Sequence, residues 1–473
     1  MPTVAELLDA LPAEAEPADS STRSEVLQKI YQRLASRRMP TGSLARCWSL
    51  SGLHARIGVA YFAYWMRSWF QTKDEREQQL VETHLRAAIK MLETMSYLRG
   101  AVAKAGQALA SMPEIVPDQF IETLGALHFQ SPPMHYSLIR EQLIDELGGN
   151  PEEVFAEFET EAFAAASLGQ VHRARLKTGE RVALKIQYPG IARTIRADMR
   201  NLAAIFAPLR LTKDWASFKV QFDEFRTLLE SETDYEREAA NLRFARELFS
   251  EDDCVVVPRV YDQYSSKRLL TMEYIEGKTT DELLASQPTQ EQLDRYGELT
   301  VRACLRMFYH RQLYTDPHPG NFLFLPDGRI GYIDFGAIRR LKDEEWAYLH
   351  RQEKAKRGSQ EEVLAVVQES LEMTDQEMKQ NPELVDLVVE GFHYYLEPHV
   401  RDELFDYGDP EYVRRGVNWL KRVSKHRRMK QKPVNVFFHK QNFQGSALGL
   451  RMGGRVNVKR IVDEEIKATG WEF

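Results

Sequence analysis

The chain has 473 residues, of which 43% are hydrophobic, 10% aromatic and 28% charged. This composition is typical of a globular protein and excludes a wholly disordered, collagen-like or coiled-coil chain. Its net charge of −7 is unevenly distributed, because residues 414–460 contain fourteen Lys or Arg and neither Asp nor Glu. At roughly 150 residues per domain, we expect two to four structural units.

The N-terminal third is predicted to be helical. Residues 1–21 are acidic and rich in Ala and Pro, and we expect a disordered tail there. A capping box at Thr22–Glu25 predicts the start of a helix, and apolar periodicity predicts further helices over residues 74–112. We therefore expect residues 22–151 to form a helical N-terminal extension. Neither a signal peptide nor a membrane-spanning stretch is expected, which favours a cytoplasmic location, peripheral to a membrane at most.

Strand signals begin after this extension. The stretch Phe163–Leu176, a turn containing Gly179, and the apolar run Arg181–Gln187 predict a β-hairpin. A helical stretch is expected from Ile191 to Glu238. Further short strands are predicted at residues 255–257 and 269–275. These elements predict a small, sheet-containing lobe over residues 152–277 with a helical insertion.

The rest of the chain is predicted to be mainly helical. One hairpin is expected, with strands at Phe322–Phe324 and Ile330–Ile333 joined by a turn of Pro, Asp and Gly. We expect residues 278–400 to form a second, helix-rich lobe. The predicted fold class is therefore α+β.

Residues 401–473 are expected to form a basic C-terminal segment. Apolar residues recur there at helical spacing, from Val413 and Val417 to Val423, which predicts one apolar face flanked by cations. Such a face could lie on an anionic membrane surface, or it could pack on the rest of the protein with its cations in solvent. No recognisable nucleic-acid module accompanies the charge, so a nucleic-acid partner is not expected.

Three polar residues near the predicted C-lobe hairpin indicate phosphoryl transfer. Asp316 stands five residues before Asn321, and Asp334 follows the strand as part of Asp-Phe-Gly. Phosphoryl transfer needs one carboxylate at the attacking group, and an amide and a second carboxylate for Mg²⁺ on the phosphates. We therefore expect Asp316 to be catalytic and Asn321 and Asp334 to be metal ligands.

Lys185 lies in an apolar strand context, Val182-Ala183-Leu184-Lys185, which resembles the phosphate-binding lysine strand of kinases. A buried ammonium requires a carboxylate partner, and the acidic run Glu232–Glu238 offers candidates. The strand before Gly277 resembles a kinase hinge, so we expect the nucleotide base to contact the residues at its end. These are Met272, Glu273 and Ile275, the last two through their backbone.

A glycine-rich phosphate loop is not found before Lys185. The corresponding positions are small but carry Cβ atoms, which closes most of the backbone space that glycine uses over phosphates. These residues are Ala164, Ala165, Ala166 and Ser167. We expect them to bind the nucleotide through a stiffer loop than glycine would give.

Taken together, these motifs resemble the UbiB/AarF family of atypical, protein-kinase-like proteins. The resemblance covers about residues 85–345 and includes segments that carry no kinase signal alone. Its motifs are Lys104-Ala105-Gly106-Gln107, AAASLGQVH, VALK, Glu232-Thr233-Asp234 with Glu238, TDPHPGN and DFG. Because several motifs occur in the family's order, the resemblance is specific.

The resemblance implies a two-lobed protein-kinase-like fold with a helical N-terminal extension and a helix-rich C-lobe. Helices carrying Lys104 and Gln107 would fold over the active site, with Lys104 approaching Glu232 in the regulatory motif that also contains Asp234. It also implies that Lys185 pairs with Glu238, and that Asn321 and Asp334 hold Mg²⁺.

From the motifs and the resemblance, we expect Mg-ATP or Mg-ADP to bind between the lobes. The expected activity is a conditional ATPase, or a small-molecule or lipid kinase. The resemblance further implies a link to ubiquinone or other isoprenoid lipid metabolism, with a lipid or anionic membrane contacting the N-terminal helices or the basic segment. Two alternatives stay open: a non-catalytic nucleotide-binding or lipid-presenting scaffold, and a phosphotransferase of the aminoglycoside or choline kinase type.

Overall fold

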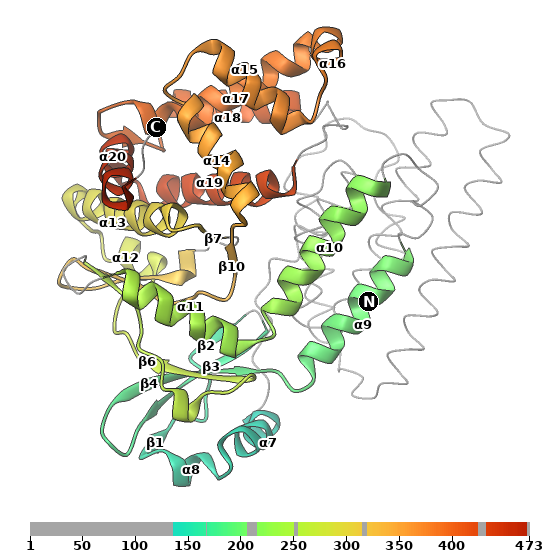
Figure 1. Ribbon diagram of the computed structural model, residues 1–473. Helices are drawn as coiled ribbons and strands as arrows, with labels where there is room; N and C mark the ends of the chain where they lie inside the picture. Colours follow the sequence, from blue (N-terminus) through green and yellow to red (C-terminus); the bar gives the residue numbers. More distant parts are fainter. Residues whose placement is uncertain are drawn as a thin grey trace, which may run out of the picture. The chain divides into compact units, whose positions relative to one another are not determined.

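The computed structural model describes residues 136–166, 168–205, 215–249, 254–314, 319–423 and 432–470. All of them belong to one compact unit, residues 132–473 (Figure 1). The predictions for the tail and most of the N-terminal extension, including Lys104 and Gln107, lie outside the described residues, as do those for Ser167 and Asp316.

An antiparallel sheet with strand order β1-β3-β4-β6, and with β2 paired to β3, forms the first lobe, here called the sheet lobe. Its strands are β1 (Glu157–Phe158), β2 (Ala164–Ala166), β3 (Gly169–Arg175), β4 (Arg181–Gln187) and β6 (Leu269–Glu273). β4 is central and buried from Val182 onward, which explains its nearly continuous apolar sequence. The turn from β3 to β4 contains Gly179 with φ +103°, a conformation that favours glycine.

One prediction for this sheet needs correction. The stretch Phe163–Leu176 is two strands, because β2 folds back on β3 with Ala166 opposite Gly169. At the start of β3, Gly169 allows a close approach to β4, since a Cβ there would lie 2.0 Å from the carbonyl oxygen of Ile186. The alanine-rich segment is thus part of the sheet.

The helices described in this half of the unit precede and follow the β3–β4 hairpin. They are α7 (Tyr136–Leu147), α8 (Pro151–Val154), α9 (Ile191–Ile205), α10 (Trp215–Ser231) and α11 (Tyr235–Leu248). The helical stretch expected to end at Glu238 is instead interrupted at residues 232–234 and continues to Leu248. Asp234 causes the new start, because its side chain accepts hydrogen bonds from the N–H groups of Glu236 and Arg237.

The second lobe, here called the helical lobe, begins with a helix pair and short strands. Its strands are β5 (Val255–Val256), β7 (Gln312–Tyr314), β8 (Phe322–Phe324), β9 (Ile330–Tyr332) and β10 (Ile338–Arg340). The predicted hairpin is present as β8 and β9, with Phe322 opposite Tyr332. β5 pairs parallel with β9, so the first predicted strand after residue 250 belongs to this hairpin and not to the main sheet.

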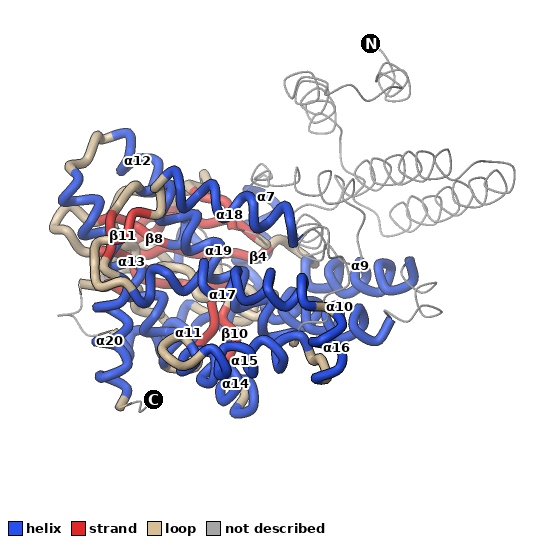
Figure 2. The backbone as a smooth tube through the Cα atoms, turned by 90° about the horizontal axis from the view of Figure 1, so that it is seen from above, coloured by secondary structure: helices blue, strands red, loops and turns tan. Residues whose placement is uncertain are grey.

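Helices make up most of this lobe (Figure 2). They are α12 (Thr280–Ala285), α13 (Gln290–Tyr309), α14 (Asp343–Ala355), α15 (Gln360–Leu371), α16 (Asp375–Gln380), α17 (Pro382–Val400), α18 (Pro410–Val423), α19 (Pro433–Met452) and α20 (Val458–Thr469), with β11 (Phe405–Asp406) and β12 (Arg455–Val456). Phe308 of α13, Phe438 of α19 and Ile461 of α20 share one core cluster. The basic segment after residue 400 therefore shares its core with the residues before it. The mixed content of antiparallel sheet and helices is the predicted α+β class.

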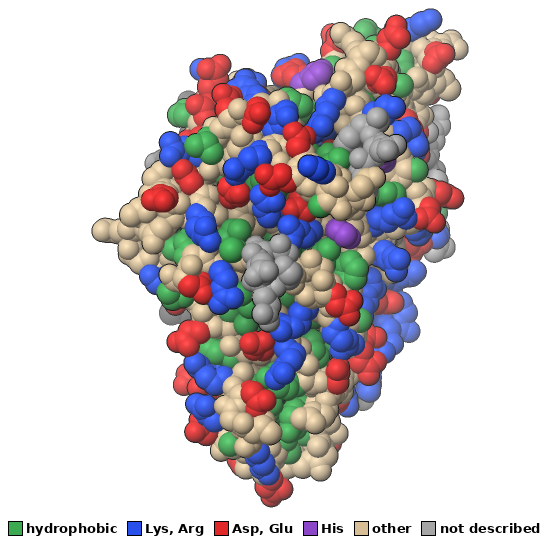
Figure 3. Space-filling view, turned by 60° about the vertical axis from the view of Figure 1, so that its left-hand side comes forward, with side chains coloured by type: hydrophobic (Ala, Val, Ile, Leu, Met, Phe, Trp, Pro, Cys, Tyr) green, Lys and Arg blue, Asp and Glu red, His purple; other side chains and the backbone are tan. Residues whose placement is uncertain are grey.

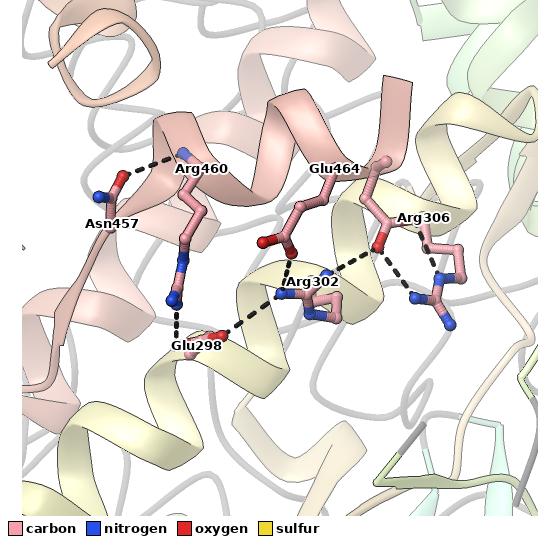
Figure 4. Close-up of polar contacts among 7 residues, drawn as sticks. Glu298, Arg302, Arg306, Asn457, Arg460 and Glu464 are labelled. Carbon is pink, nitrogen blue, oxygen red and sulfur yellow. Dashed lines mark hydrogen bonds and ion pairs between the residues drawn. The ribbon is translucent and has the colours of Figure 1, made fainter. Parts of the chain in front are cut away.

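Buried ion pairs also join α20 to α13. Glu465, with a side chain only 3% exposed, lies 3.2 Å from Arg302 and 2.9 Å from Arg306. Arg302 also pairs with Glu298 and Glu464, and Arg460 pairs with Glu298 (Figure 4). Each buried charge has an opposite charge beside it, as burial requires.

Helix α18 packs on α17 with its aromatic side. The indole N–H of Trp419 donates to the carbonyl oxygen of Leu387 at 2.8 Å, and Gly391 leaves the space for the indole. Two of its cations, Arg415 and Arg422, pair with Glu397 and Glu390 of α17. The side of α18 that carries Trp419 therefore packs on the protein, whereas Val417 of the predicted apolar face is 45% exposed.

Charges of both signs are interspersed on the face shown in Figure 3. Among the described helices, none combines the length and hydropathy needed to cross a membrane.

Candidate functional site

Lys185, Glu238 and Asp334 meet where the sheet lobe faces the helical lobe. Lys185 comes from β4, Glu238 from α11, and Asp334 follows β9. Lys185 Nζ lies 2.6 Å from Glu238 Oε1 and 3.2 Å from Asp334 Oδ2. The lysine and glutamate side chains are 8% and 3% exposed, whereas that of Asp334 is 38% exposed. The expected partner of Lys185 is thus present, and Asp334 is its solvent-facing neighbour.

Two carboxylates share one ammonium in this site. Burial opposes the charge of Lys185, but the carboxylates of Asp334 and Glu238 raise its pKa well above the usual value. Burial raises the pKa of Glu238 to about 7, with Lys185 opposing the rise and Asp334 adding to it. A charge-bearing ligand that draws Asp334 away would therefore change the proton affinity of the remaining pair.

Tyr235 covers the buried side of this pair. Its ring centroid lies 5.4 Å from Lys185 Nζ, within range of a cation–π interaction, and the residue is 2% exposed. Burial raises the pKa of its phenol, so the ring stays neutral. The ring keeps water from that side of the ammonium.

The close packing around the Asp-Phe-Gly motif explains why its third residue is a glycine. Gly336 N–H donates to Asp334 Oδ1 at 2.9 Å. A Cβ on Gly336 would lie 3.2 Å from Glu238 Oε2 and 3.3 Å from Asp334 Oδ1. Glycine lets the chain pass close to both carboxylates while its N–H orients one of them.

Tyr314 connects the two expected metal ligands. Its hydroxyl donates to the backbone carbonyl oxygen of Asp334 at 3.2 Å and accepts a hydrogen bond from Asn321 Nδ2. This contact assigns the nitrogen end of the Asn321 amide to Tyr314, so the oxygen end is the one suited to a metal. The motifs in the sequence did not indicate this role of Tyr314, because its contacts join segments that pack together only in the folded chain.

The expected hinge runs along the edge of β6. Glu273 N–H donates to the carbonyl oxygen of Arg259 at 2.8 Å, and Tyr274 N–H to that of Arg181 at 3.1 Å. The backbone N–H of Ile275 makes no backbone hydrogen bond within the described ranges. A Cβ on Gly331 would lie 2.9 Å from Ile275 Cγ2, so this glycine lets the hinge lie against β9.

The side-chain oxygens of Asn321 and Asp334 suit Mg²⁺. An amide oxygen and a carboxylate are hard ligands, and Mg²⁺ in nucleotide enzymes usually takes one or two protein ligands and completes its shell with phosphate and water. In the described part of the chain, no cluster of three or more His, Cys, Asp or Glu that could hold a metal ion is found.

A model of the ABC1 atypical kinase-like domain matches residues 126–365, just over half of the chain. The chain belongs to the UbiB/AarF family of atypical kinases. This agrees with the resemblance seen in the motifs.

Several named UbiB/AarF relatives are similar to this chain. AarF domain-containing kinase 1 of Drosophila melanogaster is 31% identical, over 59% of this chain and 55% of its own length. Atypical kinase COQ8B, mitochondrial, of Danio rerio is 30% identical, over 69% and 53%. Protein ACTIVITY OF BC1 COMPLEX KINASE 8, chloroplastic, of Arabidopsis thaliana is 35% identical, over 50% and 32%. The chain thus spans between 32% and 55% of the length of these curated relatives.

A solved structure of a related chain has the same fold. The complex of Rv3197 with erythromycin from Mycobacterium tuberculosis superposes with a TM-score of 0.55 at 27% identity. The match covers 85% of this chain and all of that one. The kinase-like fold expected for a UbiB/AarF protein is therefore shown.

Glu232 and Asp234, the two acidic residues of the family motif Glu232-Thr233-Asp234, lie in different environments. Glu232 is buried at 9% exposure, beside the turn that begins α11. Asp234 caps α11 and lies 3.3 Å from Lys267. Gln187 Nε2 donates to the carbonyl oxygen of Thr233 at 2.8 Å, which ties this turn to β4. The described contacts of Asp234 are those of a helix cap, while Glu232 lies deeper.

Proposed function

We propose that this protein binds a Mg-nucleotide between the sheet lobe and the β8–β9 hairpin and uses it as an ATPase or phosphotransferase. The observation that supports this best is Lys185, held at 2.6 Å from Glu238 and 3.2 Å from Asp334. A buried ammonium beside a partly exposed carboxylate can hold phosphate oxygens on one side and a metal on the other.

Each residue then has a distinct task. Lys185 binds the inner phosphates, and Glu238 orients Lys185. Asn321 and Asp334 hold Mg²⁺, which when bound neutralises charge on the phosphates. Asp316 lies outside the described residues, and we assign it the orientation or deprotonation of the attacking group by its spacing from Asn321. The base lies against the hinge, with Met272 beside it, the carbonyl oxygen of Glu273 accepting and the N–H of Ile275 donating.

The β2–β3 hairpin covers the phosphates in this proposal. Ala164 and Ala165 are exposed, and Ala166 is partly buried. Because β2 is a paired strand, this cover is stiffer than a glycine loop. The same stiffness favours the second candidate, a nucleotide-binding scaffold without turnover.

Our proposals for the substrate and for the metabolic role rest on the resemblance to the family. We assign the activity to isoprenoid-quinone or other lipid metabolism, with ATP or ADP as nucleotide. We also propose that the protein contacts an anionic membrane surface as a peripheral protein. Two cations of α18 already pair with glutamates of α17. We therefore propose that the membrane contacts parts of the chain other than this side of α18.

A thermal shift experiment tests the nucleotide site first. The midpoint of the purified protein is measured with Mg-ATP, Mg-ADP and Mg²⁺ alone, for wild type, Asp334→Asn and the control Asp327→Asn. Asp327 lies in the β8–β9 turn and pairs with Arg329. A ligand at a hundred times its dissociation constant should stabilise by about 2.7 kcal/mol. A shift lost only in Asp334→Asn supports the proposal, and no shift with either nucleotide contradicts it.

A turnover assay then separates the two candidates. Phosphate release from ATP is followed with and without vesicles containing anionic lipid. Hydrolysis that Asp334→Asn abolishes supports the enzyme. Nucleotide binding without hydrolysis under both conditions supports the scaffold.

A further inference from the structure

A cavity of about 90 Å³ lies inside the helical lobe, and none of the proposed nucleotide-site residues lines it. Its walls come from α13, α17 and α19 and from the segments around β11 and β12. Gly445 is the exposed member of the lining, so the cavity opens there.

Small residues keep this space open. Gly297 and Thr300 of α13 line it opposite Ser446 and Gly449 of α19. A larger residue fits poorly at Gly297, since its Cβ would lie 3.0 Å from Val456 Cγ2. Among the described residues that line the cavity there is no Asp, Glu, Lys or Arg, so a charged ligand would lose its hydration there without gaining an opposite charge from them.

His399 offers a hydrogen-bond donor to this cavity. Its Nδ1 lies 3.4 Å from Lys356 Nζ, and an ammonium can only donate, so Nδ1 must be the accepting nitrogen. Burial lowers the pKa of His399 well below the usual value, which keeps the ring neutral. Nε2 therefore carries the proton, and within the described ranges it has no protein acceptor.

Two more polar side chains line the cavity while almost fully buried. Gln441 is 7% exposed and Tyr407 is 9% exposed. Gln441 Oε1 accepts the backbone N–H of Tyr314 at 2.8 Å, which leaves its Nε2 as a donor. In the described part of the chain, neither this amide nitrogen nor the Tyr407 hydroxyl has a hydrogen-bond partner. Both groups are therefore available to a molecule in the cavity.

We propose that the cavity binds a small uncharged molecule with an apolar body and an oxygen acceptor, as in a ketone, ether or alcohol. The apolar body would occupy the space between α13 and α19, and its oxygen would accept from His399 Nε2 or Gln441 Nε2. An apolar cavity of about 150 Å³ takes up benzene, so a smaller ring or the end of a chain suits this one.

The cavity is also linked to the proposed metal site. Gln441 holds the backbone of Tyr314, whose hydroxyl contacts Asn321 and the backbone of Asp334. We therefore expect an occupant to alter Mg-nucleotide affinity. This second part rests on the proposed function, whereas ligand binding itself does not.

Cyclopentanone, labelled with ¹³C at its carbonyl, is a suitable probe. Its binding to the full chain is measured by NMR without nucleotide, for wild type and two obstructing variants, Gly445→Leu and Ser446→Leu. A Cβ at Gly445 meets no atom within 4 Å, so that variant should fold. Ser286→Leu, at the end of α12 and outside the cavity, is the control.

We expect saturable millimolar binding, a carbonyl resonance shifted as for a hydrogen-bonded ketone, and affinity at least tenfold weaker in both obstructing variants. The control should bind as wild type does. No saturable binding, or equal binding by all four proteins, overturns the proposal. An unshifted carbonyl overturns the assigned acceptor contact.

The link is tested by titrating Mg-ADP with and without saturating cyclopentanone. A severalfold change in nucleotide affinity that Gly445→Leu abolishes supports the link, and an unchanged affinity overturns it. Failure of Mg-ADP to bind in the absence of the probe contradicts the proposed function instead, and the probe titration remains a separate test of the cavity.

Discussion

The phenol oxygen of Tyr314 lies 3.2 Å from the backbone carbonyl oxygen of Asp334 and donates a hydrogen bond to it. The same oxygen accepts from Asn321 Nδ2. One side chain on β7 therefore connects the two segments that carry the proposed metal ligands. Because neither contact requires a metal, the ligands are partly oriented before the nucleotide binds.

Tyr314→Phe should weaken Mg-nucleotide binding by about tenfold, since each lost hydrogen bond costs about 1 kcal/mol. The ring should stay in place, because it packs edge-on against Tyr332. Isothermal titration calorimetry with Mg-ADP measures the effect. Tyr296→Phe is the control, since it also removes a buried hydroxyl bonded to a backbone carbonyl. Equal losses in the two variants would show that Tyr314 has no specific role in the site.

Lys185→Met should lower the free energy of unfolding by about 3–5 kcal/mol, because it leaves Glu238 buried without its cation. Glu238→Gln alone should destabilise less, because Lys185 keeps Asp334 as an anionic partner at 3.2 Å. In the double variant both charges are gone, so its loss should be clearly smaller than the sum of the single losses. Urea denaturation of the four proteins measures this coupling. Additive losses would contradict a direct pairing of the two side chains.

Nucleotide affinity should rise with pH through about 7. Burial raises the pKa of Glu238 to about 7, and only the ionised carboxylate can hold Lys185 in position. Below that pH the glutamic acid is protonated, so Lys185 loses one of its two anionic partners. Mg-ADP affinity measured from pH 5.5 to 8.5 tests this, with Glu238→Gln expected to flatten the profile. An identical profile in wild type and variant would assign the titration to another group.

Gly169→Ala should destabilise the sheet lobe by more than about 2 kcal/mol, as expected for a steric clash in a core. The added Cβ would lie 2.0 Å from the carbonyl oxygen of Ile186, so β3 and β4 would have to separate. Gly445→Ala is the opposite case, because nothing lies within 4 Å and alanine favours the helix by up to about 1 kcal/mol. Urea unfolding of both variants checks the contrast, and similar stabilities would contradict it.

Local patterns predicted several of the short strands. The apolar run of β4 and the Asp-Gly turn between β8 and β9 are short-range signals, so the sequence alone indicates both elements. Contacts between separate segments of the chain were harder to predict from the sequence. The alanine-rich segment pairs with β3 as β2, and Gly169 brings β3 close to Ile186 of β4; no local pattern records either contact. Likewise, the break before α11 depends on the side chain of Asp234.

The sequence by itself determined the family of this protein, since Lys185, Asn321 and Asp334 stand in motifs whose order identifies it. The tertiary structure alone decided that Asp334 shares the Lys185 ammonium with Glu238, because that contact depends on how the segment after β9 packs against β4. It also decided that Tyr314 contacts the proposed metal ligands and, through Gln441, a cavity wall. Charge and hydrogen bonding act over a few ångströms, so such neighbours exist only once distant segments have packed together.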